Sequence, residues 1–181
     1  MRIGKYLAFT VLAGAATAAF AHGAATGIVK ERMDGMVALR DSMKAIGPMI
    51  QGKVNYDAEV VREQAAVLKA HAGEAITSKF PKGTDGMPSE ARGEIWQDWE
   101  TFAELAKRLE LLSSALEQGA GNGLMKDGST MNSDMMQNMM SGNASGMLDE
   151  EKLAEMPADG LFTMIGKTCS ACHEKFRANM E

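Results

Sequence analysis

The spacing of apolar residues limits the fold of this 181-residue chain more strongly than any other feature of its sequence. In four stretches, at about 26–50, 57–77, 89–118 and 148–180, apolar residues recur every three or four positions. That period places them on one face of an α-helix, and no stretch shows the alternation of a strand. Four amphipathic helices with mostly short connections predict an all-α protein, an antiparallel four-helix bundle.

The same pattern predicts helix ends and inward-facing side chains. Gly47-Pro48 should weaken the last turn of the first helix, and Pro157 should interrupt the fourth. Asn55 or Asp57 can cap the second helix. The predicted inward-facing residues include Val29, Met33, Met36, Val37, Met43, Ile46 and Ile50 on the first helix and Trp96, Trp99, Phe102, Phe162 and Phe176 later in the chain.

The stretch 119–147 breaks the helical pattern. It is rich in Gly, Asn, Ser and Met, and it offers few β-branched or aromatic side chains to bury. We therefore expect a flexible Met/Gly-rich loop between the third and fourth helices.

The N-terminus has the features of a secretory signal. Arg2 and Lys5 precede a short apolar run, and Ala19-Phe20-Ala21 supplies small residues at the two positions that signal peptidase recognises. The run is shorter than the ~20 residues that a membrane-spanning helix needs. We predict that 1–21 is a cleaved signal peptide and that 22–181 is one periplasmic domain without a stable membrane span.

The charge of the chain argues against one class of partner. Lys and Arg total 19 against 24 Asp and Glu, a formal net charge of −5. The sequence lacks the basic stripe that nucleic-acid binding requires. It also lacks an evident acid–base pair, nucleophile–base pair or phosphate-binding loop, so we do not expect an enzyme.

The two cysteines lie near the C-terminus in the sequence Cys169-Ser170-Ala171-Cys172-His173. C-x-x-C-H is the attachment pattern of c-type haem. On a helix, positions i, i+3 and i+4 share a face, so both sulfurs and the imidazole can reach one edge of a planar ligand. The pattern predicts two thioether bonds to the haem vinyl groups and coordination of the iron by the imidazole.

Three other uses of the cysteines carry less weight. A thioredoxin-like redox pair would accompany a βαβ pattern, which the sequence lacks. A structural zinc site usually has four ligands, and the other histidines are His22 and His71. A disulfide across three residues within a helix is geometrically awkward.

A second pattern covers nearly all of 28–118 and 160–178. Its residues are Arg32, Met36, Gly52, Tyr56-Asp57, Phe80-Pro81, Glu94-Ile95-Trp96, Phe102, Ile165-Gly166-Lys167-Thr168-Cys169, Cys172-His173 and Phe176-Arg177. With the attachment motif so close to the C-terminus, this pattern resembles the class II cytochromes c, the cytochrome c prime family. The resemblance implies a four-helix bundle that carries one covalently attached haem c.

The resemblance also implies that the distal face of the iron decides function. In high-spin members an apolar residue covers that face, whereas in low-spin members a methionine of the first helix ligates the iron. Met36 matches the distal position, and Met33 and Met43 are the neighbouring candidates. Met/His ligation stabilises ferrous iron and suits one-electron transfer. The alternative is that Met36 is one more core methionine.

Two arginines match family positions near the haem. Arg32 corresponds to an arginine near a haem propionate, which a guanidinium can bind as a fork. A solvated surface charge is the alternative for this residue. Arg177 lies one turn after His173, and the resemblance implies that it shapes solvent access and electrostatics on the proximal side.

The family pattern does not account for the methionines of the 119–147 loop. Those with helical spacing are Met131, Met135, Met136, Met139 and Met140. Thioethers select Cu(I), so the loop is a candidate copper site, with His22 as a further ligand. The alternative is a low-complexity insertion whose methionines are incidental or scavenge oxidants.

We therefore predict a periplasmic monohaem cytochrome that carries single electrons between periplasmic redox proteins, with His173 and Met36 as iron ligands. A five-coordinate haem that binds NO or CO is the alternative function, and copper handling by the Met-rich loop is a third hypothesis. Family members often pair through their first two helices, so the resemblance is also compatible with a homodimer.

Overall fold

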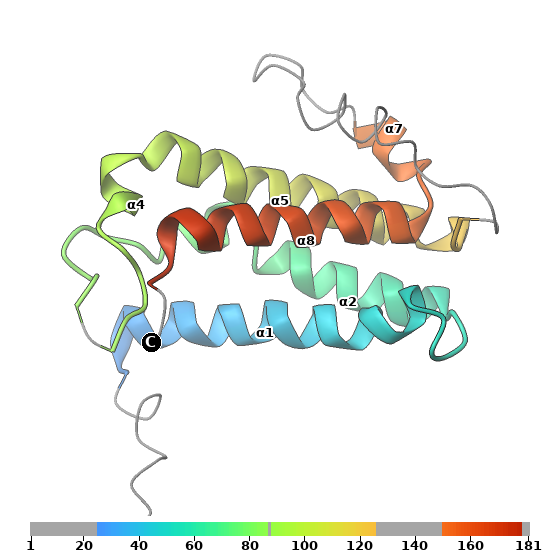
Figure 1. Ribbon diagram of the computed structural model, residues 1–181, viewed down its shortest axis with the longest axis horizontal. Coiled ribbons are helices and arrows are strands. Elements are labelled where there is room, and N and C mark those ends of the chain that lie inside the picture. Colours follow the sequence, from blue (N-terminus) through green and yellow to red (C-terminus); the bar gives the residue numbers. More distant parts are fainter. Residues whose placement is uncertain (1–24, 87, 126–149, 179–181) are drawn as a thin grey trace, which may run out of the picture.

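The computed structural model of the chain describes residues 25–86, 88–125 and 150–178. Its four long helices are α1 (Gly27–Ile50), α2 (Ala58–Ala70), α5 (Trp99–Gly119) and α8 (Ala158–Phe176). They lie side by side, with α1 and α5 running one way and α2 and α8 the other (Figure 1). The predicted antiparallel four-helix bundle is therefore confirmed.

The shorter elements are α3 (Glu74–Thr77), α4 (Glu94–Gln97), the 3₁₀ helix η1 (Ala120–Asn122) and α7 (Glu150–Ala154). They divide two of the predicted helices. The second ends before Gly73, whose φ of 55° is left-handed and interrupts a helix. The third begins at Glu94 and not at Ser89, because Ala91 instead forms an antiparallel bridge with Arg177.

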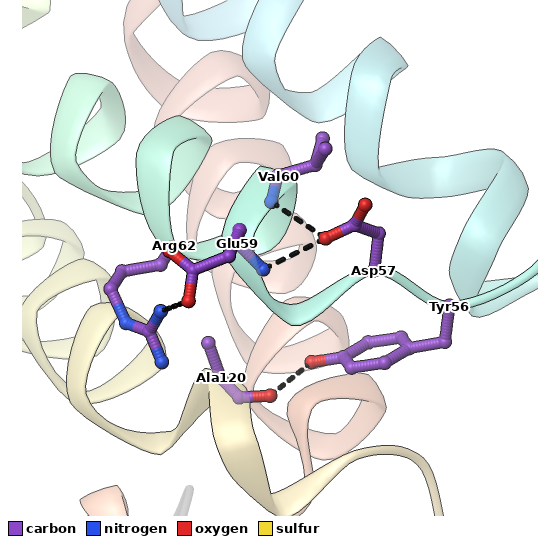
Figure 2. Close-up of polar contacts among 6 residues, drawn as sticks. All are labelled: Tyr56, Asp57, Glu59, Val60, Arg62 and Ala120. Carbon is purple, nitrogen blue, oxygen red and sulfur yellow. Dashed lines mark hydrogen bonds and ion pairs between the residues drawn. The ribbon is translucent and has the colours of Figure 1, made fainter.

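Local side-chain contacts fix the start of α2. The Asp57 carboxylate accepts hydrogen bonds from the backbone N–H groups of Glu59 and Val60, at 2.9 and 3.2 Å (Figure 2). It is therefore the N-cap, one of the two predicted. Next to it, the Tyr56 hydroxyl donates to the carbonyl oxygen of Ala120 at 2.6 Å. This bond ties the start of α2 to the chain just after α5.

The two prolines in the predicted helices behave differently. Pro157, with φ −60° and ψ 146°, is the N-cap of α8, so the predicted break between α7 and α8 is confirmed. Its missing N–H costs nothing at that position. Pro48 lies inside α1, which continues to Ile50.

The hydrophobic core lies where α5 packs against α2, α7 and α8. Its fully buried side chains come from every long helix. They include Ile46, Val61, Leu68, Leu112, Leu116, Leu153, Leu161, Met164 and Ile165. Burying each large apolar side chain contributes roughly 1.5–3 kcal/mol. These residues join the helices, and the half-buried Cys169 and Cys172 pack against the same core.

Trp99 was predicted to face inward and does not, so that prediction was wrong. Val37 and Trp99 are each 41% exposed. Trp99 is the first residue of α5, at the end of the bundle, where its ring leans on Phe102 with the centroids 5.5 Å apart. On α1, Leu39 and Ile46 are buried among the other helices, while Val37 lies on the wall of a cavity.

Two predicted segments lie largely or wholly outside the described residues. They are the signal peptide, 1–21, and the Met-rich loop, 119–147, of which the structure describes only the beginning. There Asn122 donates from its side-chain amide to the carbonyl oxygens of Ala154 and Met156, at 2.7 and 3.0 Å. These bonds attach the end of α5 to the chain between α7 and α8. Within the described ranges, no helix is long and apolar enough to cross a membrane.

Close packing at this junction predicts a stability effect at Gly119. A Cβ atom there would lie 2.6 Å from the carbonyl oxygen of Ala154. Because that neighbour is backbone, it cannot move aside as a flexible side chain would. We expect Gly119→Ala to lower the free energy of unfolding by about 1–3 kcal/mol, measured by urea denaturation of the mature protein.

Gly121→Ala is the matched control, because a Cβ atom at Gly121 meets nothing within 4 Å. We expect its free energy of unfolding to stay within about 0.5 kcal/mol of the original value. An equal loss of stability in both variants would contradict the role of the contact with Ala154.

Candidate functional site

A cavity of about 430 Å³ lies between α1, α5 and the C-terminal half of α8. Its volume is in the range of small-molecule and cofactor sites. Most of the side chains that line it are apolar, and the charged ones are few. The lining residues are Arg32, Met33, Met36, Val37, Leu39, Arg40, Met43, Ile76, Phe80, Ser89, Glu90, Ala91, Ile95, Phe102, Leu105, Ala106, Leu109, Thr168, Cys169, Cys172, His173, Phe176 and Arg177.

The attachment motif lies on the wall of this cavity. Cys169, Cys172 and His173 belong to α8 and line the cavity together, as their i, i+3, i+4 spacing predicts. The turn before them is buried at Ile165 and Thr168. Because this turn is packed into the bundle, the face that carries the three donors is held toward the cavity.

The protein environment sets the protonation of the two thiols. Cys169 and Cys172 are half-buried and are not joined to each other. Burial raises the pKa of both, and that of Cys172 reaches about 11, with a further contribution from Cys169. At neutral pH both groups are therefore protonated thiols.

His173 lies in the neutral form that a metal requires. The residue as a whole is exposed, but it lines the cavity and is partly buried there. This burial lowers the pKa of His173, the Arg177 charge lowers it further, and Glu90 opposes both effects. A neutral imidazole at pH 7 keeps a free nitrogen lone pair for coordination.

The apolar stripe of α1 supplies another wall of the cavity. Met33, Met36 and Met43 all line it, and all three are half-buried. The structure thus brings every methionine that the sequence nominated as a distal ligand to the same cavity as His173. Their thioethers are soft, polarisable donors next to the apolar wall.

Arg32 is buried and not a solvated surface charge, so that alternative is wrong. It is 5% exposed. Its guanidinium donates to the Thr84 hydroxyl at 3.0 Å, to the Thr84 carbonyl and to the Ser89 hydroxyl, and it lies 4.7 Å from the ring centroid of Phe80. Burial lowers the pKa of Arg32, and the charge of Asp85 opposes this. A fixed guanidinium therefore borders the cavity.

Arg177 borders the cavity on the α8 side, in an ion pair with Glu90 at 2.6 Å. Sequence reasoning identified Arg177 but missed Glu90 and Ser89. Both lie just before α4, and their sequence spacing gives no signal for the site. Their position depends on the bridge that brings Ala91 beside Arg177.

Aromatic rings form part of the apolar lining. Phe102 contacts Phe80 and Phe176 edge-on, with ring centroids 4.9 and 5.4 Å apart. All three are buried and line the cavity, so the predicted inward position of Phe102 and Phe176 is confirmed. Trp96 donates from its indole nitrogen to the Phe80 carbonyl at 2.9 Å and so holds the backbone that carries this ring.

The described part of the chain does not favour the other uses of the cysteines. It contains no group of three or more His, Cys, Asp or Glu residues that could hold a metal ion, and no βαβ unit. The predicted copper ligands lie outside the described residues. They are Met131, Met135, Met136, Met139, Met140 and His22.

The residues of the cavity fit a c-type haem. Two thiols and one neutral imidazole share a helix face, which is the donor set that tethers this cofactor and ligates its iron. Apolar side chains suit the ring, and the guanidinium of Arg32 at the border suits a carboxylate. The donor chemistry and the shape of the lining therefore agree with the sequence motif.

Known proteins resemble the chain over most of its length. A family model described as Cytochrome C′ matches residues 27–141. Cytochrome c′ from Pararhodospirillum photometricum is 25% identical over 150 residues, which are 82% of this chain and 94% of the relative. Cytochrome c-554 from Cereibacter sphaeroides is 24% identical over 145 residues, which are 78% of this chain and 74% of the relative.

Solved structures share the fold. A nitric oxide complex of a cytochrome c prime variant from Alcaligenes xylosoxidans superposes with a TM-score of 0.60 at 22% identity. The match covers 84% of this chain and 94% of that structure. The arrangement of the four long helices is therefore the one found in that protein.

The raised thiol pKa values predict slow alkylation of Cys172 in the folded, haem-free chain. In a Cys169→Ala variant, burial still raises the pKa of Cys172 above its usual value of 9.0, although the contribution of Cys169 is gone, so less of the thiol is ionised at pH 8 than in the unfolded chain. We expect iodoacetamide to react correspondingly more slowly than in denaturant, and the rate to rise with pH. The measurement is the mass of the alkylated chain over time.

Circular dichroism of the same sample serves as the control, because it shows whether the haem-free chain is helical. A helical chain that reacts at the denatured rate would contradict the burial of Cys172.

Proposed function

The chain belongs to the cytochrome c prime family, whose cofactor is a covalently attached haem c, and from this we propose that it is a periplasmic electron carrier with Met36 and His173 as the two iron ligands. The haem supplies a one-electron ferric/ferrous couple when it is bound. Cys169 and Cys172 hold the group covalently, and neutral His173 presents a nitrogen to the iron.

The observation that supports Met36 most directly is the shared cavity wall. Met36 lies on α1 between Met33 and Met43, and all three border the cavity that the attachment motif lines. A thioether ligand favours the ferrous state and raises the potential. It also keeps the same atoms around the iron in both oxidation states, so little rearrangement accompanies electron transfer.

The other cavity residues position the group and keep water away from it. The rings of Phe80, Phe102 and Phe176 make part of the apolar lining. The buried guanidinium of Arg32 offers donors to a carboxylate of the cofactor edge. An apolar surround lowers the local dielectric and thereby influences the potential.

Binding of a small neutral ligand is the second candidate function. One of the matched structures is a nitric oxide complex of a cytochrome c prime variant. For this second function, Met36 would shield the distal face of the iron as an apolar residue and would not ligate it. The iron would be five-coordinate and open to NO or CO.

Met36→Leu distinguishes the two functions. We expect the oxidised wild-type protein to be low-spin with a thioether-to-iron charge-transfer band, and the variant to lose that band and become high-spin, because leucine has no donor. Its midpoint potential should fall, since the ligand that favours ferrous iron is gone. Absorption spectra in both oxidation states and a redox titration provide the measurement.

Met33→Leu and Met43→Leu are the matched controls, and both should keep the wild-type spectrum. A high-spin wild-type spectrum at neutral pH would reject Met36 ligation and favour the NO or CO function. Loss of the band in a control variant instead of Met36→Leu would assign the ligand to that neighbour.

Export to the periplasm is tested by the N-terminus of the mature protein. If 1–21 is a signal peptide, the haem-loaded protein from a periplasmic extract should begin at His22. Intact-mass analysis measures this and also reports one haem per chain. A mature protein that retains its first residues would contradict cleavage.

A further inference from the structure

We propose that Glu90 is a positioning residue that holds the Arg177 guanidinium beside the proximal ligand His173, so that an ion pair and not a free cation determines the field on that side of the iron. The proposal rests on haem in the cavity, as in the proposed function. It does not depend on which group occupies the distal position.

The backbone places Glu90 next to the end of α8. Residues 88–92, which we name the strap, run antiparallel to the chain just after the attachment motif. The N–H of Ala178 donates to the Glu90 carbonyl at 2.8 Å, and the N–H of Arg92 donates to the Phe176 carbonyl at 3.0 Å. These two bonds flank the bridge between Ala91 and Arg177. The position of Glu90 relative to α8 is therefore fixed by main-chain contacts.

The side chains complete the pair. The Arg177 Nε lies 2.6 Å from the Glu90 Oε2. Glu90 is the less exposed partner, with 25% of its side chain exposed against 49% for Arg177. Both line the cavity with His173. Without the carboxylate, a half-exposed guanidinium would gain more hydration by turning toward solvent than by remaining at the cavity.

The other end of the strap is anchored to α1. The buried Arg32 donates to the Ser89 hydroxyl, and that hydroxyl accepts a hydrogen bond from the N–H of Ala91 at 3.0 Å. The strap therefore has one contact with the helix that carries Met36 and another with the helix that carries His173. Because it is held at both ends, Glu90 has little freedom to follow Arg177 outward.

The electrostatic consequence is specific to the pair. Oxidised haem iron carries one more positive charge than reduced iron, so a nearby cation favours the reduced state and a nearby anion the oxidised state. With Glu90 present, Arg177 stays beside His173 and its charge is felt at the iron. When Glu90 is replaced by a neutral residue, as in Glu90→Gln, Arg177 moves to solvent, where its charge is screened.

A double-mutant cycle on the midpoint potential of the haem-loaded protein tests this. Arg177→Gln should lower the potential in the wild-type background, because a cation beside the iron is lost. The same change should produce a shift smaller by about half or more in a Glu90→Gln background, where Arg177 is no longer held. Equal shifts in the two backgrounds would overturn the proposal.

Asp98→Asn provides the matched control. Asp98 pairs with Lys175 near the same end of α8, and neither residue lines the cavity. Arg177→Gln should therefore shift the potential as much in the Asp98→Asn background as in wild type. If Asp98→Asn reduces the shift as Glu90→Gln does, the effect is a general loosening of this end of the molecule, and the proposal fails.

Two further measurements keep the test decisive. Should Glu90→Gln fail to retain haem, Glu90→Asp keeps the negative charge and should preserve most of the Arg177→Gln shift; a shift reduced by about half or more in that background counts against the proposal. The spectrum of each variant reports distal ligation separately. A high-spin wild-type spectrum would reject Met36 ligation, but the double-mutant cycle could still be measured. Equal Arg177→Gln shifts in the wild-type and Glu90→Gln backgrounds of a low-spin protein would reject the role of Glu90 and not that of Met36.

Discussion

The packing of α5 against α2 and α8 is the interaction on which the rest of the structure depends. Leu112 and Leu116 on α5 and Leu161 and Ile165 on α8 are fully buried. They fill the part of the bundle where α8 begins, and this leaves the C-terminal half of α8 to border a cavity. None of these four side chains lines the cavity, so the helix that carries the attachment motif is held in place by residues that take no part in binding.

The apolar stripe of α1 serves two purposes. Ile46 and Met49 belong to the core, Met33 and Met36 line the cavity, and Leu39 does both. A helix face that meets a cofactor needs the same apolar residues as one that meets another helix. This explains why the apolar face of α1 includes residues beyond those in the core, and why Val37 is exposed although it lies on the cavity wall.

Charged groups reach the cavity from two directions, and each is held by a hydrogen-bonding partner. Arg32 is buried and bonded to Thr84 and Ser89, and Arg177 is paired with Glu90. A buried or half-buried cation without such partners would be costly. The segment just before α4 supplies Ser89 and Glu90, so a short connection with no regular structure links the two arginines around one cavity.

The sequence by itself determined the helices, the cap at Asp57, the break at Pro157 and the shared face of Cys169, Cys172 and His173, because each depends on spacing within a few residues. Only the tertiary structure decided that Glu90 meets Arg177, because these residues are far apart in the chain and come together through a main-chain bridge. It also decided which apolar residues of α1 enter the core and which line the cavity. Hydrophobic periodicity predicts that one face of a helix is buried, but it does not predict whether another helix or a ligand buries that face.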